Sequence, residues 1–164
     1  MKALKCFKPM NKRIVYIGAE RVGLVCLQKL MDLGKNVVAV LTADDSLEYK
    51  IADFVSFDEN VEKIPLYKVV NTKDPETMLL IKNLKPDLII VISWSQIIPK
   101  EILDYAPLGC IGIHYSLLPE RRGGAPLNWA IIDGLKKNGI TLFFYDSGVD
   151  TGDIIAQKEF EITD

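Results

Sequence analysis

The run Leu88-Ile89-Ile90-Val91-Ile92 decides the fold, because five consecutive apolar residues are typical of a strand that is covered on both faces. Other apolar runs lie on either side of it along the chain, and stretches with helical spacing separate them. This alternation predicts an α/β domain with a Rossmann-like, mostly parallel central sheet and helices on both faces.

The same criteria predict the remaining elements. Strands are expected at 13–17, 37–41, 65–70, 110–114, 140–145 and 153–160, with an antiparallel pairing as one arrangement of the last two. Helices are expected at 22–33, 75–83, 99–105 and 125–133, with a short helix and a loop in the less regular segment 42–63. Ligands of open α/β sheets bind beyond the carboxyl ends of the strands, so the residues that follow the strands are the candidate site.

The overall composition is that of an ordinary globular protein, with 49% hydrophobic and 26% charged residues and a net charge of −2. A bulk electrostatic case for binding nucleic acid is therefore absent, although a local basic patch stays open. No apolar run has the length of a membrane span, so we expect no membrane association. The basic residues 1–12 are predicted to be a solvated lead-in to a domain at 13–164.

The three cysteines, Cys6, Cys26 and Cys110, are widely spaced and form no CxxC pair. This usage predicts a reduced, cytoplasmic protein without a disulfide framework. One histidine and three scattered cysteines leave few soft metal ligands, so no metal site is expected.

The only histidine, His114, lies in the most patterned stretch of the chain, residues 112–126, at the end of an expected strand. Its unperturbed pKa is nearest to neutral pH, so it suits acid or base chemistry. The loop 146–153 holds three carboxylates and two glycines. It is either an acidic turn or the source of a carboxylate that approaches His114 and tunes its tautomer or takes a proton.

Two further loops have both a structural and a functional interpretation. Residues 116–126 combine proline, glycine and arginine, which favours a structured binding loop in which Arg121 and Arg122 hold an anion or are simply solvated. Residues 18–23 match neither a dinucleotide fingerprint nor a P-loop, so a tight strand-to-helix turn is expected there.

The run His114-x-Ser116-Leu117-Leu118-Pro119-x-x-Arg122-Gly123, followed by Asp150-x-Gly152, resembles the 10-formyltetrahydrofolate-dependent formyltransferases. The similarity covers essentially the whole chain after Lys12, including residues 85–89 and 96–99. It implies a formyltransferase-type fold and the transfer of a formyl group from 10-formyltetrahydrofolate to a primary amine. Related proteins continue beyond this point into a helix and often a further domain, so the resemblance implies a catalytic domain that lacks those parts.

The resemblance also implies residue roles. His114 and Asp150 correspond to the family's catalytic His and Asp, whereas Gly112 stands where the family has Asn. An amide there would donate a hydrogen bond to the developing oxyanion, and removing one such donor typically costs about 100- to 1000-fold in rate. A water or a backbone N–H would have to substitute, or the activity is weak. The residues implied to bind folate are Gln96, Ile97, Ile98, Ser116, Leu117, Leu118, Pro119, Asp146, Ser147, Gly148 and Val149.

The acceptor is a separate question. Methionyl-tRNA formyltransferases resemble the chain strongly but carry a basic segment after the second strand, whereas residues 43–60 are acidic here and would repel tRNA. The run Ala125-Pro126-Leu127-Asn128-Trp129 resembles the nucleotide-linked amino-sugar formyltransferases. A nucleotide-linked amino sugar or other small amine is therefore the favoured acceptor, with methionyl-tRNA as an alternative.

Two further functions are compatible with the same motifs. One is hydrolysis of 10-formyltetrahydrofolate, which uses a similar site and needs no amine. The second is a folate- or nucleotide-binding module that lost catalysis together with the asparagine. These patterns do not specify the oligomeric state.

Overall fold

The computed structural model of the protein describes residues 11–58, 61 and 63–163, so most of the expected basic lead-in lies outside the described residues. The described residues form a seven-stranded sheet in the order β3-β2-β1-β4-β5-β6-β7. The strands are β1 (Ile14–Gly18), β2 (Val37–Ala43), β3 (Leu66–Val69), β4 (Leu88–Ile92), β5 (Cys110–His114), β6 (Lys137–Phe144) and β7 (Ile154–Glu161). The helices are α1 (Arg21–Asp32), α2 (Pro75–Leu84), α3 (Lys100–Leu103) and α4 (Pro126–Ile132), with a 3-10 helix η1 (Asp45–Lys50).

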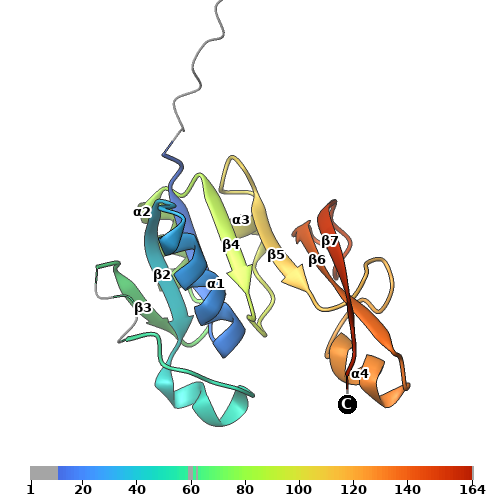
Figure 1. The fold of residues 1–164 in the computed structure, drawn as a ribbon. Coiled ribbons are helices and arrows are strands. Elements are labelled where there is room, and N and C mark those ends of the chain that lie inside the picture. The colour runs from blue at the N-terminus through green and yellow to red at the C-terminus, as the bar shows by residue number, and fades with distance from the viewer. Residues whose placement is uncertain (1–10, 59–60, 62, 164) are drawn as a thin grey trace, which may run out of the picture.

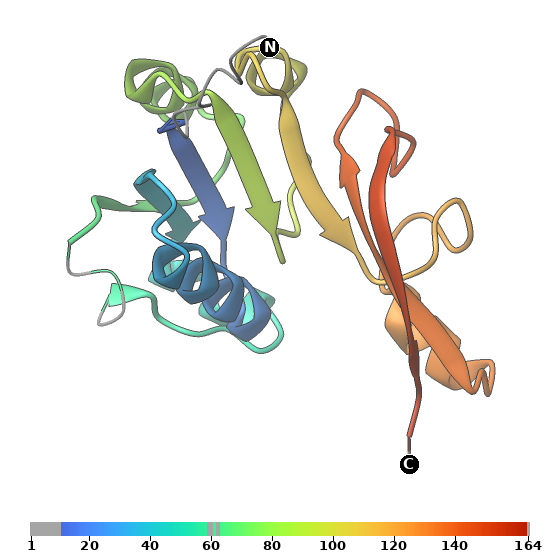
Figure 2. The ribbon, with the colours of Figure 1, turned by 45° about the horizontal axis from the view of Figure 1, so that its top comes forward.

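Parallel pairing joins β3, β2, β1, β4 and β5, and the sheet becomes antiparallel from β5 to β6 and from β6 to β7. The predicted mostly parallel α/β sheet is thereby confirmed, as is the antiparallel arrangement of its last two strands. Figure 2 shows β6 and β7 as a long hairpin that diverges from the parallel strands. The carboxyl ends of β1, β4 and β5 point to one common edge of the sheet (Figure 1).

The two faces of the sheet bury separate hydrophobic clusters, which explains why the central strands are apolar throughout. Along β4, Ile89 and Val91 pack on the face covered by α2 and α3, whereas Ile90 and Ile92 pack on the face covered by α1. Figure 1 shows α1 in front of the sheet and α2 and α3 behind it. Because side chains alternate along a strand, Cys110, Gly112 and His114 of β5 share the face of α2 and α3.

Most elements differ from the sequence expectation by one or two residues at an end, and β6 differs most. Strand β6 begins at Lys137 rather than at 140. The prediction missed its first residues because they are polar, and the strand was sought by its hydrophobic pattern. Asn138 is nevertheless buried, and its Nδ2 donates to the carbonyl of Tyr115 at 2.9 Å. Helix α3 ends at Leu103, two residues before the predicted end at 105.

Candidate functional site

His114 is delivered to the carboxyl edge by β5, and it is buried there, with 7% of its surface exposed. Its Nε2 lies 2.8 Å from the carbonyl oxygen of Arg121, and its Nδ1 lies 3.5 Å from Oδ2 of Asp150. A carbonyl oxygen can only accept a hydrogen bond, so Nε2 carries the ring proton. Nδ1 faces the carboxylate, so the two atoms are placed to hold one proton between them.

Asp150 is held in place by the loop that follows β5. Its Oδ2 accepts a hydrogen bond from the backbone N–H of Gly123 at 2.8 Å, and its carbonyl accepts one from Nε of Arg122 at 2.8 Å. Asp150 adopts the left-handed backbone conformation, with φ 53°. Asp tolerates that conformation better than most residues but is still strained by it, so the loop contacts must hold it there.

Left-handed backbone is concentrated at this edge of the sheet. Ser93, Arg121 and Ala125 join Asp150 among the non-glycine residues with positive φ. Such conformations cost free energy and persist where surrounding contacts enforce them, which is typical of functional sites. The two arginines of the loop after β5 belong to these contacts. Arg121 pairs with Asp133 at 2.8 Å and Arg122 binds the Asp150 carbonyl, so both have protein partners.

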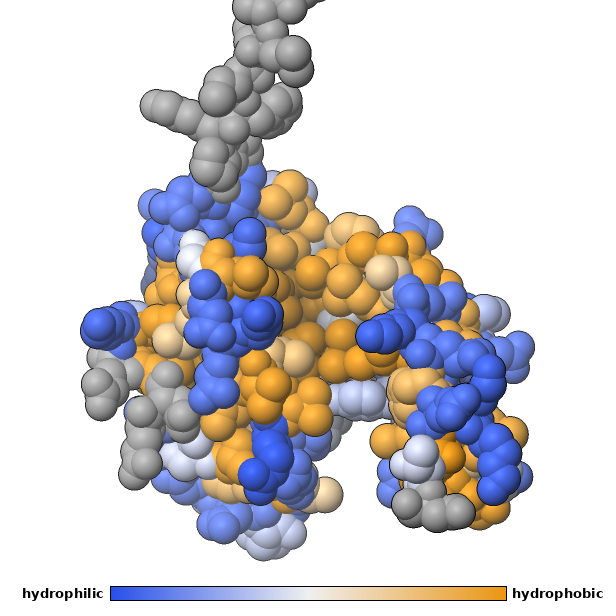
Figure 3. Space-filling model, in the orientation of Figure 1, coloured by the Kyte–Doolittle hydropathy of each residue, from blue (hydrophilic) through white to orange (hydrophobic). Residues whose placement is uncertain are grey.

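A cavity of about 330 Å³ opens between the end of β4, α3 and the loop after β6, and we name it the Trp94 cavity. It is lined by residues 94–100, Leu103, Phe143 and residues 145–150. Asp150 thus belongs both to the cavity wall and to the pair with His114. Figure 3 shows the molecule notched between its η1 side and its α4 side, below the ends of β4 and β5.

The structure brings two of the three expected folate-binding segments together in the Trp94 cavity, residues 96–98 and 146–149. Ile97 is largely exposed, Ile98 is buried, and the amide of Gln96 is used internally. Gln96 accepts from the backbone N–H of Thr72 at 3.0 Å and donates to the carbonyl of Val70 at 2.8 Å. The side chain of Gln96 therefore fastens the end of β3 to the cavity wall.

The third expected segment, Ser116, Leu117, Leu118 and Pro119, does not line this cavity. It is fastened to the hairpin by Thr141, whose Oγ1 donates to the Ser116 carbonyl at 2.6 Å and accepts from the Leu118 N–H at 3.1 Å. Nε2 of Gln157 donates to the same hydroxyl at 2.9 Å. The peptide bond between Leu118 and Pro119 is cis. This segment fixes the path of the loop that carries Arg121, Arg122 and Gly123 to Asp150.

A side chain at Gly112 would have to displace the ring of Tyr145. A Cβ built there would lie 2.5 Å from Cε1, 2.6 Å from Cζ and 2.6 Å from the hydroxyl oxygen of Tyr145. The phenol ring of Tyr145 thus occupies the space that a side chain at position 112 would take. Sequence reasoning missed Tyr145 and Phe143, because both lie inside an expected strand, where an aromatic residue is ordinarily core. Trp94 follows β4, and its position directly after a strand was the feature of the sequence that could have placed it in the site.

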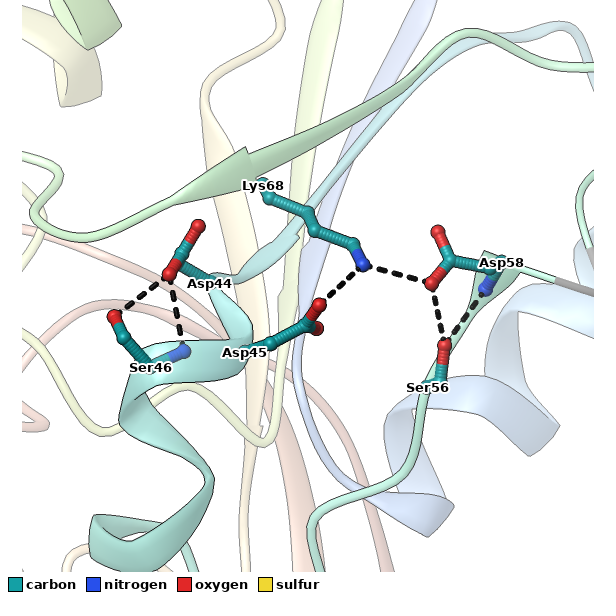
Figure 4. A network of polar contacts seen from close by, with 6 residues as sticks. All are labelled: Asp44, Asp45, Ser46, Ser56, Asp58 and Lys68. Atoms are coloured by element: carbon teal, nitrogen blue, oxygen red, sulfur yellow. Dashed lines mark hydrogen bonds and ion pairs between the residues drawn. The ribbon is translucent and has the colours of Figure 1, made fainter.

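The acidic segment after β2 lies at the same edge and is tied together by one lysine (Figure 4). Nζ of Lys68 lies 2.7 Å from a carboxylate oxygen of Asp45 and 2.8 Å from one of Asp58. Hydrogen bonds from Lys68 and Ser56 hold the pKa of Asp58 below its usual value, and those from Ser46 do the same for Asp44. The segment therefore stays negatively charged at neutral pH.

Within residues 11–58, 61 and 63–163, no group of three or more His, Cys, Asp or Glu side chains is placed to hold a metal ion. Cys26 and Cys110 are free, and burial raises the pKa of the Cys110 thiol to about 12. None of the described helices is long and apolar enough to cross a membrane.

The model of the formyl transferase family matches residues 12–164. The chain belongs to the formyl transferase family. Members of this enzyme family use 10-formyltetrahydrofolate as the formyl donor. The resemblance of the chain to this family is thereby confirmed, together with the formyltransferase-type fold.

Curated relatives in the family include methionyl-tRNA formyltransferases. The one from Clostridioides difficile (strain 630) is 40% identical over 157 residues, which cover 92% of this chain and 50% of the relative. The one from Clostridium beijerinckii is 43% identical over 155 residues, with the same coverage of 92% and 50%. The chain thus spans about half the length of the curated relatives it matches.

Solved structures share the fold at lower identity. A phosphoribosylglycinamide formyltransferase from Bacillus halodurans has a TM-score of 0.74 at 21% identity, covering 93% of this chain and 81% of that one. A formyltetrahydrofolate deformylase from Pseudomonas syringae pv. tomato has a TM-score of 0.73 at 23% identity, covering 93% of this chain and 52% of that one. These matches establish the formyltransferase-type sheet.

Proposed function

We propose that the protein transfers a formyl group from 10-formyltetrahydrofolate to a primary amine. The observation that carries this proposal is the pair of His114 and Asp150, 3.5 Å apart, with Asp150 in the wall of the Trp94 cavity. A titratable pair beside a cavity of ligand size is the arrangement that proton-coupled group transfer requires.

The donor is proposed to occupy the Trp94 cavity. Nε1 of Trp94 is a buried donor without a hydrogen-bond partner in the part of the chain that the structure describes. Buried N–H groups are almost always satisfied, so this one points to a ligand acceptor atom. The exposed Ile97 adds apolar surface suited to the flat ring system of a folate. No metal is part of the proposal.

The chemistry moves one proton from the amine to the folate. The amine nitrogen attacks the formyl carbon, a C–N bond forms, and the formyl oxygen gains negative charge. The bond from carbon to N10 then breaks, its electron pair stays on N10, and N10 takes a proton. His114 and Asp150 hold the proton that the amine releases, because Nδ1 and Oδ2 face each other with Nε2 already protonated.

We propose methionyl-tRNA as the acceptor. The support comes from the curated relatives at about 40% identity, which are methionyl-tRNA formyltransferases. This departs from the acceptor that the sequence patterns favoured, a nucleotide-linked amino sugar, which remains the second candidate. The observation that favours the sugar is the negatively charged segment held by Lys68 at the carboxyl edge, since it repels a phosphate backbone. A cytoplasmic location belongs to the same proposal.

The test supplies the full chain with 10-formyltetrahydrofolate and, in parallel, methionyl-tRNA, a thymidine-diphosphate-linked amino sugar, or water alone. Formyl incorporation and tetrahydrofolate release are both measured. We expect incorporation into methionyl-tRNA with the higher kcat/KM. Higher kcat/KM for the amino sugar would reverse the choice of acceptor, and release of formate without incorporation would make the protein a hydrolase.

The matched variant for this test is His114→Gln. Its amide can still donate to the Arg121 carbonyl, but it cannot take a proton at the position of Nδ1. We expect kcat to fall about 100- to 10,000-fold, the usual contribution of general acid–base catalysis. Unchanged turnover in His114→Gln would contradict the proposed site, and folate binding without turnover in the parent would identify a binding module.

A further inference from the structure

Tyr145 places a hydroxyl group over Gly112, the position of β5 without a side chain that lies two residues before His114. Gly112 and His114 share a face of β5, and the hydroxyl oxygen of Tyr145 lies 2.6 Å from the Cβ position of Gly112. In an asparagine, standard bond lengths put the amide nitrogen about 2.4 Å from its own Cβ. The phenol oxygen is therefore nearly as far from the Cβ position of Gly112 as an asparagine nitrogen would be from its own Cβ.

The surroundings of this hydroxyl leave it available to a ligand. Tyr145 lines the Trp94 cavity together with Asp150, and its ring packs on Phe143 with centroids 5.0 Å apart. Its ring position is also fixed from the backbone, because the Tyr145 N–H donates to the Cys110 carbonyl at 2.8 Å. Its hydroxyl has no hydrogen-bond partner among the residues that the structure describes, and the packing of the ring keeps it aimed at the space above Gly112.

The charge state of the phenol suits a donor. Burial raises the pKa of Tyr145 above its ordinary value, and the neighbouring Cys110 and Asp150 add to the rise. The side chain is therefore neutral and protonated throughout the neutral range, so it can donate a hydrogen bond to a negatively charged oxygen. Such a charge-assisted bond is about twice as strong as one between neutral groups.

We propose that the Tyr145 hydroxyl donates the hydrogen bond that stabilises the formyl oxygen in the transition state. This inference rests on the proposed formyl transfer and assigns its oxyanion donor. As the C–N bond to the amine forms, the oxygen gains charge and Tyr145 keeps its proton while donating to it. When the bond to N10 breaks, the carbonyl is restored and the hydrogen bond weakens. No net proton passes through Tyr145.

The test compares Tyr145→Phe with the parent chain in tetrahydrofolate release and in formyl transfer to methionyl-tRNA. Loss of the hydroxyl alone is expected to lower kcat about 100- to 1000-fold with little change in the KM for 10-formyltetrahydrofolate. Tyr105→Phe is the matched control, because its hydroxyl donates to the Lys82 carbonyl on an exposed surface, and it should retain full activity.

A pair of further variants tests the same idea from the other side. Gly112→Asn alone should force the ring of Tyr145 away from its place over Gly112, because the new Cβ would lie 2.5 Å from Cε1 of that ring. Combined with Tyr145→Ala, which empties that space, Gly112→Asn should raise kcat at least about tenfold above Tyr145→Ala alone, since the amide then supplies the donor.

The outcomes separate this inference from the proposed function. A parent chain that turns over 10-formyltetrahydrofolate with no loss in Tyr145→Phe overturns the oxyanion role and leaves formyl transfer intact. A parent chain without any turnover overturns both. A fall in kcat in Tyr145→Phe, with KM and thermal stability unchanged, supports the role.

Discussion

Nδ1 of His114 lies 3.5 Å from Oδ2 of Asp150, although one residue ends the last parallel strand and the other follows the antiparallel β6. The site is thus assembled where the sheet changes from parallel to antiparallel pairing. The loop after β5 closes this junction, because Arg122 and Gly123 bind the carbonyl and the carboxylate of Asp150. Proton handling therefore depends on the join between the two halves of the sheet.

Asp150→Asn tests this dependence with little structural disturbance. Asn tolerates the left-handed conformation that Asp150 adopts, and its oxygen can still accept from the Gly123 N–H. We expect kcat for formyl transfer to fall about 100- to 10,000-fold, because an amide cannot share a proton with Nδ1. Steady-state kinetics measure this. The control is Asp153→Asn in the same loop, which should behave as the parent does. Full activity in Asp150→Asn would remove Asp150 from the mechanism.

Alkaline pH should destabilise the protein through buried tyrosines. Burial raises the pKa of Tyr16, so the folded state keeps its phenol protonated under conditions in which the unfolded chain ionises. Its contribution to stability is complete below pH 10, the ordinary pKa, and declines as the pH rises further. Each such group costs about 1.4 kcal/mol of unfolding free energy per pH unit in that range.

Urea unfolding of Tyr16→Phe between pH 8 and 11 measures that slope. The variant should decline less steeply above pH 10 than the parent. At neutral pH, we expect it to be about 1 kcal/mol less stable, because the hydroxyl donates to the Gly23 carbonyl. Tyr49→Phe, at a side chain that is 79% exposed, is the control and should keep the parental slope. Equal slopes in the parent and Tyr16→Phe would contradict the prediction.

Thr141→Val should weaken the seam between the loop after β5 and the hairpin. The Thr141 hydroxyl is fully buried and forms hydrogen bonds with the Ser116 carbonyl, the Leu118 N–H and the Gln157 amide. An isosteric methyl group leaves these polar atoms without that partner, so we expect a loss of at least about 2 kcal/mol in the free energy of unfolding. Chemical denaturation measures it, and Thr163→Val, at an exposed residue, should change stability little. A Thr141→Val protein as stable as the parent would refute this account of the seam.

The charge of η1 should affect the KM for methionyl-tRNA. Glu48 is exposed in the acidic segment after β2, and we expect Glu48→Lys to lower the KM for methionyl-tRNA and to steepen its salt dependence. The KM for an amino-sugar nucleotide should change less, because fewer phosphates take part. Asp32→Lys at the end of α1 is the control. No difference between the two lysine variants would place the tRNA path away from η1.

The parallel part of the fold could be predicted because its strands are buried on both faces. Runs such as 88–92 and 110–114 are apolar or small almost throughout, so their bounds follow from the sequence alone. The start of β6 could not be found in this way. Lys137 and Asn138 are polar, and Asn138 is buried only because Tyr115 offers it a carbonyl from a distant segment.

Some residues of the candidate site could likewise be predicted from the sequence, and others could not. His114 could be placed from its position at the end of an expected strand, Asp150 from the loop after another, and both from the family resemblance, and they meet in the structure. Tyr145 could not, since its importance lies in a contact with Gly112 that no local pattern encodes. The supporting role of Thr141 was hidden for the same reason, because a single threonine in a strand is ordinary.

The close fit of the Tyr145 ring over Gly112 also has an evolutionary consequence. A change to asparagine at 112 requires the Tyr145 ring to move, and a change to a smaller residue at 145 leaves an empty space beside Gly112. The effect of a substitution at either position therefore depends on the residue at the other, so the two positions are epistatic. A lineage that acquired one arrangement would find the other difficult to reach by single steps. Glycine at 112 and tyrosine at 145 should therefore be inherited together among descendants of this sequence.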